Sequence, residues 1–175
     1  MKWAILTSGP YMEMMSGMWA PTKEGETYVF GVPLQTGAIP MIHTADLGRY
    51  ARWIFDHPDE SVGLNFLGKF RIISLGKNLK IATQHVDFDQ VAKAFEKVTG
   101  KKAVYRDVPL EQWFDGQVTE DASSAYQVKA DEPGAMTWRK NFTGWWNMWR
   151  NSGGTNPIVS RDYALLDKVK LWSFQ

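Results

Sequence analysis

The sequence contains no cysteine, which excludes a disulfide framework, a thiolate nucleophile and a cysteine-ligated metal. It also has almost no net charge: 20 basic residues against 19 acidic ones leave +1, whereas nucleic-acid binding needs a basic excess on one face. Its apolar runs are too short for a membrane span or for the core of a signal peptide. We therefore expect a cytoplasmic protein whose partners include neither nucleic acid nor a membrane.

Aromatic side chains, in contrast, are abundant. They make up 14% of the chain and include nine tryptophans, within a hydrophobic total of 44%. That content is enough to bury a core, and a length of 175 residues favours one domain. Three tryptophans stand together in "TGWWNMW", residues 143–149. So much indole predicts either a wide apolar pocket or a surface that another part covers.

The pattern along the chain predicts an α/β protein with few strands. Short apolar and β-branched runs between Gly, Pro and polar residues indicate strands, and apolar residues three and four apart indicate helices. The strands are expected at Trp3–Thr7, Ile39–Ile42, Leu79–Thr83 and Ala103–Val108, and Gly25–Leu34 is expected to form a strand or a hairpin. The helices are expected over 11–18, 44–57, 87–99, 109–114, 135–151 and 161–169.

Two of these helices have the clearest signals. Thr44 is expected to cap the first, and Pro58 to end it. Asp87 is expected to cap the second, which ends at Gly100. The apolar faces predicted to point inward are Leu47, Tyr50, Ala51, Ile54 and Phe55 in the first helix, and Phe88, Val91, Ala92, Phe95 and Val98 in the second.

The signature of a dinucleotide-binding half is missing from this sequence. Such a half needs a first strand, a glycine-rich turn at the start of a helix, and an acidic residue about 20 positions later. The order of the expected elements contains no run of consecutive βαβ units either. The sequence itself therefore predicts no NAD(P) phosphate site.

Three segments together carry a resemblance to a known family: "WAILTSGPYMEMM", "GAIPMIHTADLGRYARWIFDHPDESVG" and "LKIATQHVDFDQVAKAFEKVTGKKAVYRDVP". Their order and spacing resemble the second half of the NmrA-like proteins, atypical members of the short-chain dehydrogenase/reductase superfamily. The resemblance implies a partial Rossmann-type protein, with the last sheet strands and the smaller α/β substrate domain spanning 1–175. The stretch Leu64–Gly76 departs from the family pattern and is interpreted as a recent insertion or an unspliced intron.

The resemblance also implies a role for this chain and for some of its residues. It would be the substrate-binding half of an NAD(P)-dependent oxidoreductase-like protein, present as a natural short form, a truncated product or a fragment. Gly9, Pro10 and Tyr11 would lie beside the cofactor, and Tyr11 and Met14 beside the substrate. Equally, these residues could form a plain strand-to-helix turn. We expect no NAD(P) bound by this chain alone and no dehydrogenase activity.

No catalytic residue can be named from the sequence. The superfamily's usual proton donor is a Tyr followed four residues later by Lys, and none of the six tyrosines meets this condition. The histidines His43, His57 and His85 are isolated, so no metal site is predicted.

The predicted helix at 135–151 carries a row of aromatic residues. Its members are interpreted as core packing, as a wall for a flat apolar ligand, or as a surface that the missing half covers: Trp138, Phe142, Trp145 and Trp149, with Trp146 beside them.

Three functions remain open at this point. The chain could be the substrate domain of an NAD(P)-dependent oxidoreductase, a non-redox small-molecule binder or isomerase, or a regulatory interaction module. In each case the expected partner is a small apolar or aromatic molecule, together with self-association or a partner chain.

Overall fold

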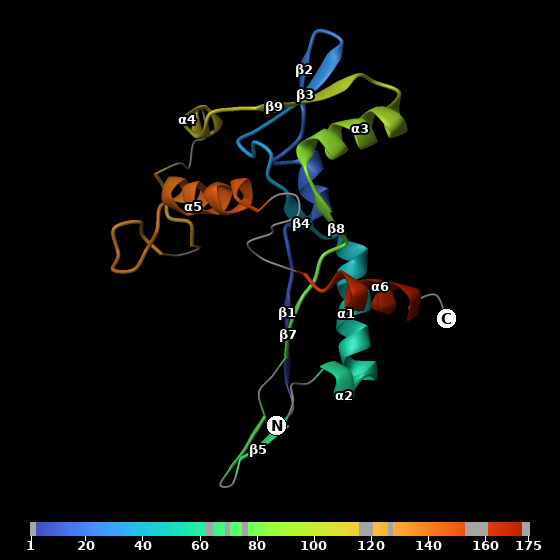
Figure 1. Ribbon diagram of the computed structural model, residues 1–175. Coiled ribbons are helices and arrows are strands. Elements are labelled where there is room, and N and C mark those ends of the chain that lie inside the picture. Colours follow the sequence, from blue (N-terminus) through green and yellow to red (C-terminus); the bar gives the residue numbers. More distant parts are fainter. Residues whose placement is uncertain are drawn as a thin grey trace. The chain divides into compact units, whose positions relative to one another are not determined.

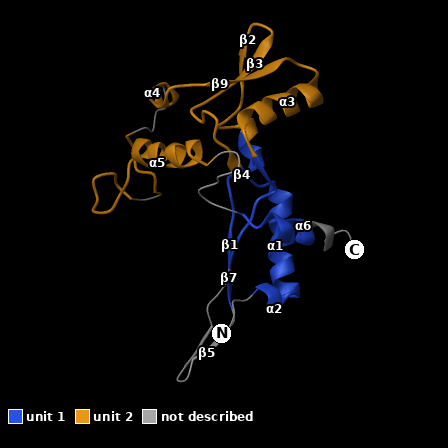
Figure 2. Cartoon of the chain, in the orientation of Figure 1, with its two compact units in different colours: residues 1–14, 40–85, 160–175 blue, residues 15–39, 86–159 orange. Residues whose placement is uncertain are grey.

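The computed structural model describes residues 3–61, 65–68, 71–74, 77–115, 121–125, 128–152 and 161–172. The length of the chain predicted one domain, whereas the contacts divide it into two compact units (Figure 2). Unit 1 comprises residues 1–14, 40–85 and 160–175, and unit 2 comprises residues 15–39 and 86–159. Both mix helices with short strands (Figure 1), which confirms the predicted α/β class. Each unit is described by itself.

Unit 1 is built on two parallel strands that pair over four residues, from Ala4 opposite Lys77 to Thr7 opposite Lys80. In chain order its elements are β1 (Ala4–Thr7), η1 (the 3-10 helix Met12–Ser16, which runs on into unit 2), α1 (Thr44–Asp56), α2 (Pro58–Ser61), β5 (Asn65–Gly68), β6 (Arg71–Ser74), β7 (Lys77–Lys80) and α6 (Tyr163–Trp172). β4 (Ile39–Met41) and β8 (Gln84–Val86) pair with each other, and the chain passes between the units within them.

The core of unit 1 lies on one side of the β1–β7 pair. Leu6 and Ala4 of β1 and Leu79 of β7 contribute to it from the strands, and α1 and α6 close it. Its fully enclosed members are Ile42, Tyr50, Trp53, Leu79, Ile81, Leu166 and Val169.

Helix α1 differs from its prediction at both ends. Its N-cap is His43, whose Nδ1 accepts the N–H of Ala45, and not Thr44. Pro58 ends α1 as predicted but then opens the single turn α2. Phe55, predicted to point inward, is 81% exposed, and Trp53 is buried in its place.

Unit 2 contains a three-stranded sheet in the order β2–β3–β9. β2 (Thr22–Glu24) and β3 (Thr27–Val32) form an antiparallel hairpin, and β9 (Ala103–Asp107) lies parallel to β3. The hairpin turns at Gly25, which has a φ of 58°. The segment 25–34, predicted as a strand or a hairpin, is therefore the second arm of a hairpin. The helices of unit 2 are α3 (Phe88–Thr99), α4 (Leu110–Phe114) and α5 (Trp138–Arg150).

Helix α3 covers the sheet of unit 2 and follows its prediction closely. Asp87 and Gln90 form a reciprocal capping box, and Gly100 ends the helix with a φ of 68°. Phe88 is buried against Phe30 of β3. Only Val98 departs from the predicted inward face, because it is 84% exposed.

Other boundaries shift by a few residues. The strand predicted at Leu79–Thr83 is β7, which ends at Lys80, and β8 was not predicted. Within the predicted insertion Leu64–Gly76, β5 and β6 pair antiparallel, while positions 64, 69–70 and 75–76 lie outside the described residues.

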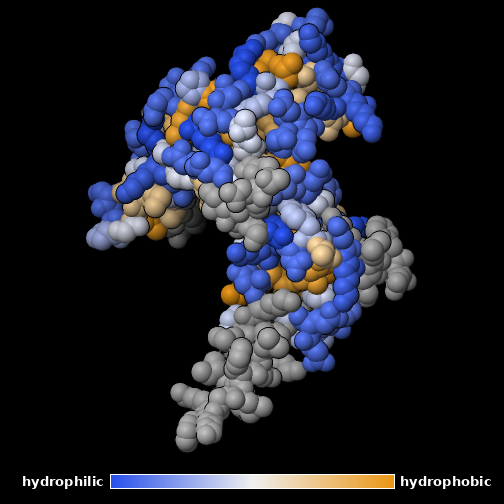
Figure 3. All heavy atoms as spheres, in the orientation of Figure 1, coloured by the Kyte–Doolittle hydropathy of each residue, from blue (hydrophilic) through white to orange (hydrophobic). Residues whose placement is uncertain are grey.

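Most of the described surface in the view of Figure 3 is hydrophilic, and hydrophobic residues reach it in separate patches on both units. Within the described ranges, no helix has the length and apolar character needed to cross a membrane.

Candidate functional site

Three segments of unit 1 run in the same direction and end near one another. β1 and β7 are parallel, and beyond β1 the residue Tyr11 forms a parallel bridge with Ile42. The N–H of Thr83, which follows β7, donates to the carbonyl of Met41 at 2.8 Å. Ligands of open α/β sheets bind at the carboxyl ends of parallel strands. The segments that follow these strands therefore make the first candidate site.

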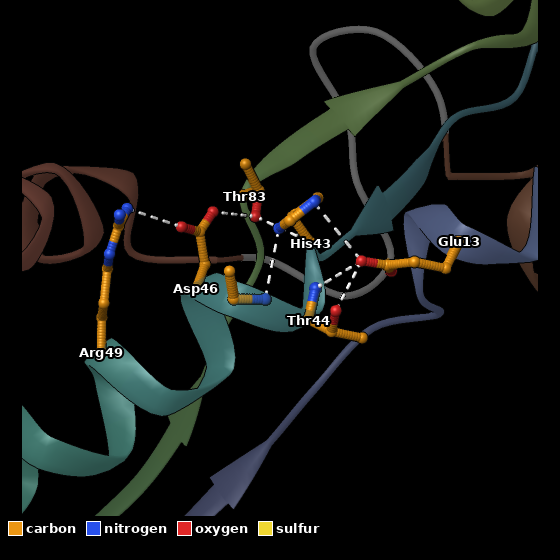
Figure 4. A network of polar contacts seen from close by, with 7 residues as sticks. Glu13, His43, Thr44, Asp46, Arg49 and Thr83 are labelled. Atoms are coloured by element: carbon orange, nitrogen blue, oxygen red, sulfur yellow. Dashed lines mark hydrogen bonds and ion pairs between the residues drawn. The ribbon is translucent and has the colours of Figure 1, made fainter.

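A carboxylate from η1 organises this candidate site (Figure 4). Glu13 Oε1 accepts the hydroxyl of Thr44 at 2.6 Å and its backbone N–H at 3.0 Å, and lies 3.5 Å from Nε2 of His43. The bond from the Thr44 hydroxyl is the main reason why the pKa of Glu13 is lowered. Glu13 therefore stays ionised at the start of α1, where a negative charge is favourable.

Thr83 ties the other side of the same helix start to the sheet (Figure 4). Its hydroxyl accepts the backbone N–H of His43 at 3.0 Å and donates to Asp46 Oδ2 at 2.6 Å. Asp46 in turn pairs with Arg49 at 3.0 Å, one turn along α1. This network holds the first turn of α1 against the ends of the parallel segments.

His43 is poorly suited to act as a general base here. Its Nδ1 accepts the N–H of Ala45, so that nitrogen is unprotonated and Nε2 carries the hydrogen that faces Glu13. A proton on Nδ1 would meet the Ala45 N–H donor and break the cap of α1. The arrangement therefore suits positioning better than proton transfer.

The tyrosines Tyr50 and Tyr105 are not acids at neutral pH either. The Tyr50 hydroxyl donates to the carbonyl of Ala82 at 3.2 Å, and the Tyr105 hydroxyl to Gln35 at 3.2 Å. Burial is the largest cause that raises the pKa of both hydroxyls above the usual range. Both act as structural donors.

The pyrophosphate of NAD(P) is normally held by free N–H groups at the N-terminus of a helix. Each described helix of ten or more residues is already capped by a side chain of its own chain. For α1 the caps are Glu13 and His43. For α3, α5 and α6 they are Asp87, Thr137 and Asp162, which accept the N–H groups of Gln90, Lys140 and Leu165. Each of these helix ends therefore already has at least one of its N–H groups paired with a side chain of the same chain, which makes it a poorer site for a pyrophosphate.

The residues predicted beside the cofactor lie at the end of β1. Gly9 faces the backbone of β4, because a Cβ built on it would lie 1.6 Å from the carbonyl oxygen of Pro40. The carbonyl of Pro10 accepts the N–H of Ile42 at 2.9 Å, and Tyr11 is exposed. Met14 follows in η1 and is half-buried. The close approach that Gly9 permits is thus a contact within the protein.

The aromatic residues predicted as a ligand wall are brought together in unit 2. Trp138 and Phe142 have ring centroids 4.1 Å apart, Phe142 and Trp145 are 6.0 Å apart, and Trp145 and Trp149 are 5.9 Å apart. They form one continuous row along α5. Trp149 is buried and the other three are half-buried. Core packing thus explains the inner end of the row, and the outer rings remain accessible.

Sequence reasoning missed two contributors to this row and two to the polar network. Trp19 contacts Trp145 at 5.6 Å from a segment more than a hundred positions earlier, and Trp113 of α4 contacts Phe142 at 5.6 Å. Glu13 and Thr83 join the start of α1 from other elements. No local periodicity marks any of the four.

The described residues contain no group of three or more His, Cys, Asp or Glu side chains placed to hold a metal ion.

Comparisons with known proteins place the chain in a family. The sequence model of the NmrA-like family matches residues 3–138. NmrA, a negative transcriptional regulator, in complex with NADP, has a TM-score of 0.56 at 16% identity, covering 97% of this chain and 48% of NmrA. A doubly substituted NmrA has a TM-score of 0.55 at the same 16% identity and the same coverage of 97% and 48%. The chain thus spans about half the length of the NmrA structures it matches.

Two further comparisons carry less. A nucleoside-diphosphate-sugar epimerase from Staphylococcus aureus has a TM-score of 0.43 at 17% identity, over 64% of this chain and 34% of the epimerase, which supports no argument. No curated protein matches the sequence. The likeness to NmrA shows a shared fold, and the family model matches well over half of the chain. The chain belongs to the NmrA-like family.

Proposed function

We propose that this chain is the substrate-binding half of an NmrA-like, NAD(P)-linked protein. It binds a small apolar or aromatic molecule and is inert as a dehydrogenase by itself. The nucleotide-binding part is supplied by other sequence, on the same polypeptide or on a partner chain.

The capping of the helix N-termini is the observation that carries this proposal. NmrA binds NADP. In the described residues of this chain, the longer helix ends already carry side-chain caps from Glu13, Asp87, Thr137 and Asp162, each of which pairs an N–H group that a pyrophosphate would need. Three of these are carboxylates, which repel phosphate as well as block it. The family membership and the coverage of about half of NmrA point in the same direction.

The proposed roles of the residues follow from their places. Tyr11 is exposed at the carboxyl end of β1, where its ring and hydroxyl can face a ligand, with Pro10 and Gly9 shaping the turn and Met14 beside it. The row Trp138, Phe142, Trp145 and Trp149 offers the aromatic surface. Within the described residues these groups supply contact and orientation.

Titration with NADPH, followed by tryptophan fluorescence, tests the proposal. We expect no saturable binding in the micromolar range and no NADPH oxidation by the isolated chain with carbonyl substrates. NmrA, which binds NADP, serves as the positive control for the assay. A micromolar dissociation constant for NADPH would overturn the proposal, because it would require a phosphate site that this chain provides.

A regulatory interaction module is the second candidate, favoured by one observation: the fold matches a negative transcriptional regulator. Such a module would convert no substrate, so turnover would be missing while a protein partner is bound. An isomerase is less well supported, because Nδ1 of His43 already accepts the N–H of Ala45 and Nε2 lies 3.5 Å from Glu13 Oε1.

A further inference from the structure

Trp145 of α5 is the hub of a tryptophan cluster in unit 2. Its ring centroid lies 5.6 Å from that of Trp19, 4.7 Å from that of Trp146 and 5.9 Å from that of Trp149. Trp19 precedes β2, whereas the other three belong to α5. The cluster is thus assembled by the fold and is more than a property of one helix.

The three tryptophans around the hub share an unusual feature. They are 2% (Trp19), 0% (Trp146) and 4% (Trp149) exposed, and the indole Nε1 of each is buried with no hydrogen-bond partner among the described residues. Five buried side-chain atoms in the described part of the chain lack a partner, and three of the five belong to rings whose centroids lie within 6 Å of that of Trp145. Buried donors without acceptors destabilise a fold, and native structures keep few of them.

Trp145 differs from its three neighbours because it is only half-buried. Its ring stands nearly perpendicular to those of Trp146, at 86°, and Trp149, at 74°. The face of an aromatic ring is at best a weak acceptor for an N–H group. Trp145 therefore fills the centre of the cluster without satisfying the donors around it, and it is the member that can leave toward solvent.

We propose that Trp145 occupies the place of a flat aromatic ligand that carries a hydrogen-bond acceptor, such as a ring carbonyl. Indole Nε1 is a donor only, so a bound ligand must present acceptors to Trp19, Trp146 or Trp149. The ligand would be at least the size of an indole and would take the place of the Trp145 ring in the aromatic row, next to Phe142 and Trp149, so that Trp145 leaves the row when the ligand binds. This inference rests on the proposed small-molecule function and specifies its substrate class.

Three bicyclic probes of similar size separate the contributions of shape and hydrogen bonding. 1-Indanone carries a carbonyl acceptor, indane carries no polar group, and indole carries a donor. Each is titrated against the wild-type chain and against Trp145→Ala by calorimetry, without nucleotide. In both proteins we expect 1-indanone to bind about tenfold tighter than indane or indole, as one added hydrogen bond predicts. Trp145→Ala should bind 1-indanone more tightly than wild type, because no side chain has to be displaced.

Two further variants test the donors themselves. Trp146→Phe keeps an aromatic ring but removes its N–H, and should reduce the preference for 1-indanone over indane. Trp3→Phe is the matched control, since Trp3 lies in unit 1 outside the cluster, and it should leave that preference unchanged. Because the wild-type chain is itself titrated, the test does not depend on the folding of any variant.

Two results would overturn the inference. Equal binding of indane and 1-indanone to Trp145→Ala would show that the indole donors do not recognise an acceptor. No binding of 1-indanone to the wild-type chain would show that Trp145 is a permanent core side chain. Neither result bears on NADPH binding, so failure here is distinguishable from failure of the proposed function.

Discussion

Replacing Gly9 by Ala should strongly destabilise unit 1. A Cβ at this position would lie 1.6 Å from the carbonyl oxygen of Pro40 and 2.8 Å from its carbonyl carbon. Both are backbone atoms of β4, so no side chain can rotate away. Ordinary contact would require the two segments to separate by about 2 Å in a tightly packed interior. The same separation would strain the hydrogen bond from the Ile42 N–H to the Pro10 carbonyl.

The expected cost of this substitution is about 3 kcal/mol, the upper end of what overpacking usually costs. With a urea slope of about 2 kcal/mol/M, the midpoint of unfolding should fall by about 1.5 M. Urea titration followed by far-ultraviolet circular dichroism measures this shift.

Gly48→Ala is the matched control in the same unit. Gly48 lies inside α1, and a Cβ there would meet no atom within 4 Å. Ala is the better helix former, so this variant should gain about 1 kcal/mol and raise the midpoint. Equal midpoints for Gly9→Ala and wild type would refute the reasoning, because they would mean that the end of β1 does not approach Pro40 this closely.

Two smaller predictions concern side chains that cap helices. Asp87→Ala should lower the free energy of unfolding by about 1 kcal/mol, because it removes the cap of α3. Asp89→Ala removes a first-turn charge and leaves the cap in place, so it should cost only a few tenths of a kcal/mol. Thermal unfolding of both variants checks the difference. The pKa of Glu13 is lowered from its ordinary value of 4.5, chiefly by the Thr44 hydroxyl. Ionised Glu13 therefore stabilises the fold fully above pH 4.5, and this contribution is lost as the pH falls through the lowered pKa of the folded state. Urea unfolding between about pH 3 and pH 6 should therefore show a steeper acid loss for wild type than for Glu13→Gln, and parallel curves would contradict this assignment.

The two main amphipathic helices show how far local pattern reaches. α3 was predicted with both caps because its signals, Asp87 and Gly100, lie within the helix boundary itself. For α1 the apolar stripe was predicted, but its border was placed at Phe55, which is exposed, and not at Trp53, which is buried. At about 100° per residue, Phe55 and Trp53 stand on opposite borders of the stripe around Tyr50. In the folded chain Trp53 is packed into the core and Phe55 is exposed. The sequence alone does not specify which border of the stripe is buried.

The candidate sites depend on contacts that no local pattern encodes. Thr44 is a good N-cap by residue type, but its hydroxyl donates to Glu13, 31 positions earlier in the chain. The N-cap of α1 is therefore His43. Trp19 stands alone between Gly17 and Pro21 without any periodicity, although it joins the tryptophan cluster. The aromatic row on α5 was predicted because its members repeat at helical spacing. Its partners were not, because they come from other elements.

The face of the β1–β7 pair opposite the core of unit 1 leads to a last prediction, that the isolated chain self-associates. Trp3 just before β1 is 43% exposed and Ile5 within it is 47% exposed, while their neighbours Ala4 and Leu6 pack into the core. Among the described strands, β1 pairs only with β7. Parallel sheets are usually covered on both faces, and an open apolar edge is a template for association.

Burying roughly 100 Å² of apolar surface on each such side chain contributes about 2.5 kcal/mol, so a few residues suffice to drive association. We expect size-exclusion chromatography with light scattering to give a mass above the 20.0 kDa of one chain. Ile5→Lys should lower that mass toward the monomer because it places a charge on the open face. Phe55→Lys should not, although Phe55 is more exposed, because it lies on α1 away from this face. A stable monomer at high protein concentration that binds no hydrophobic dye would show that unit 1 needs no cover, and the open face of β1 would no longer support the proposal that other sequence completes this protein.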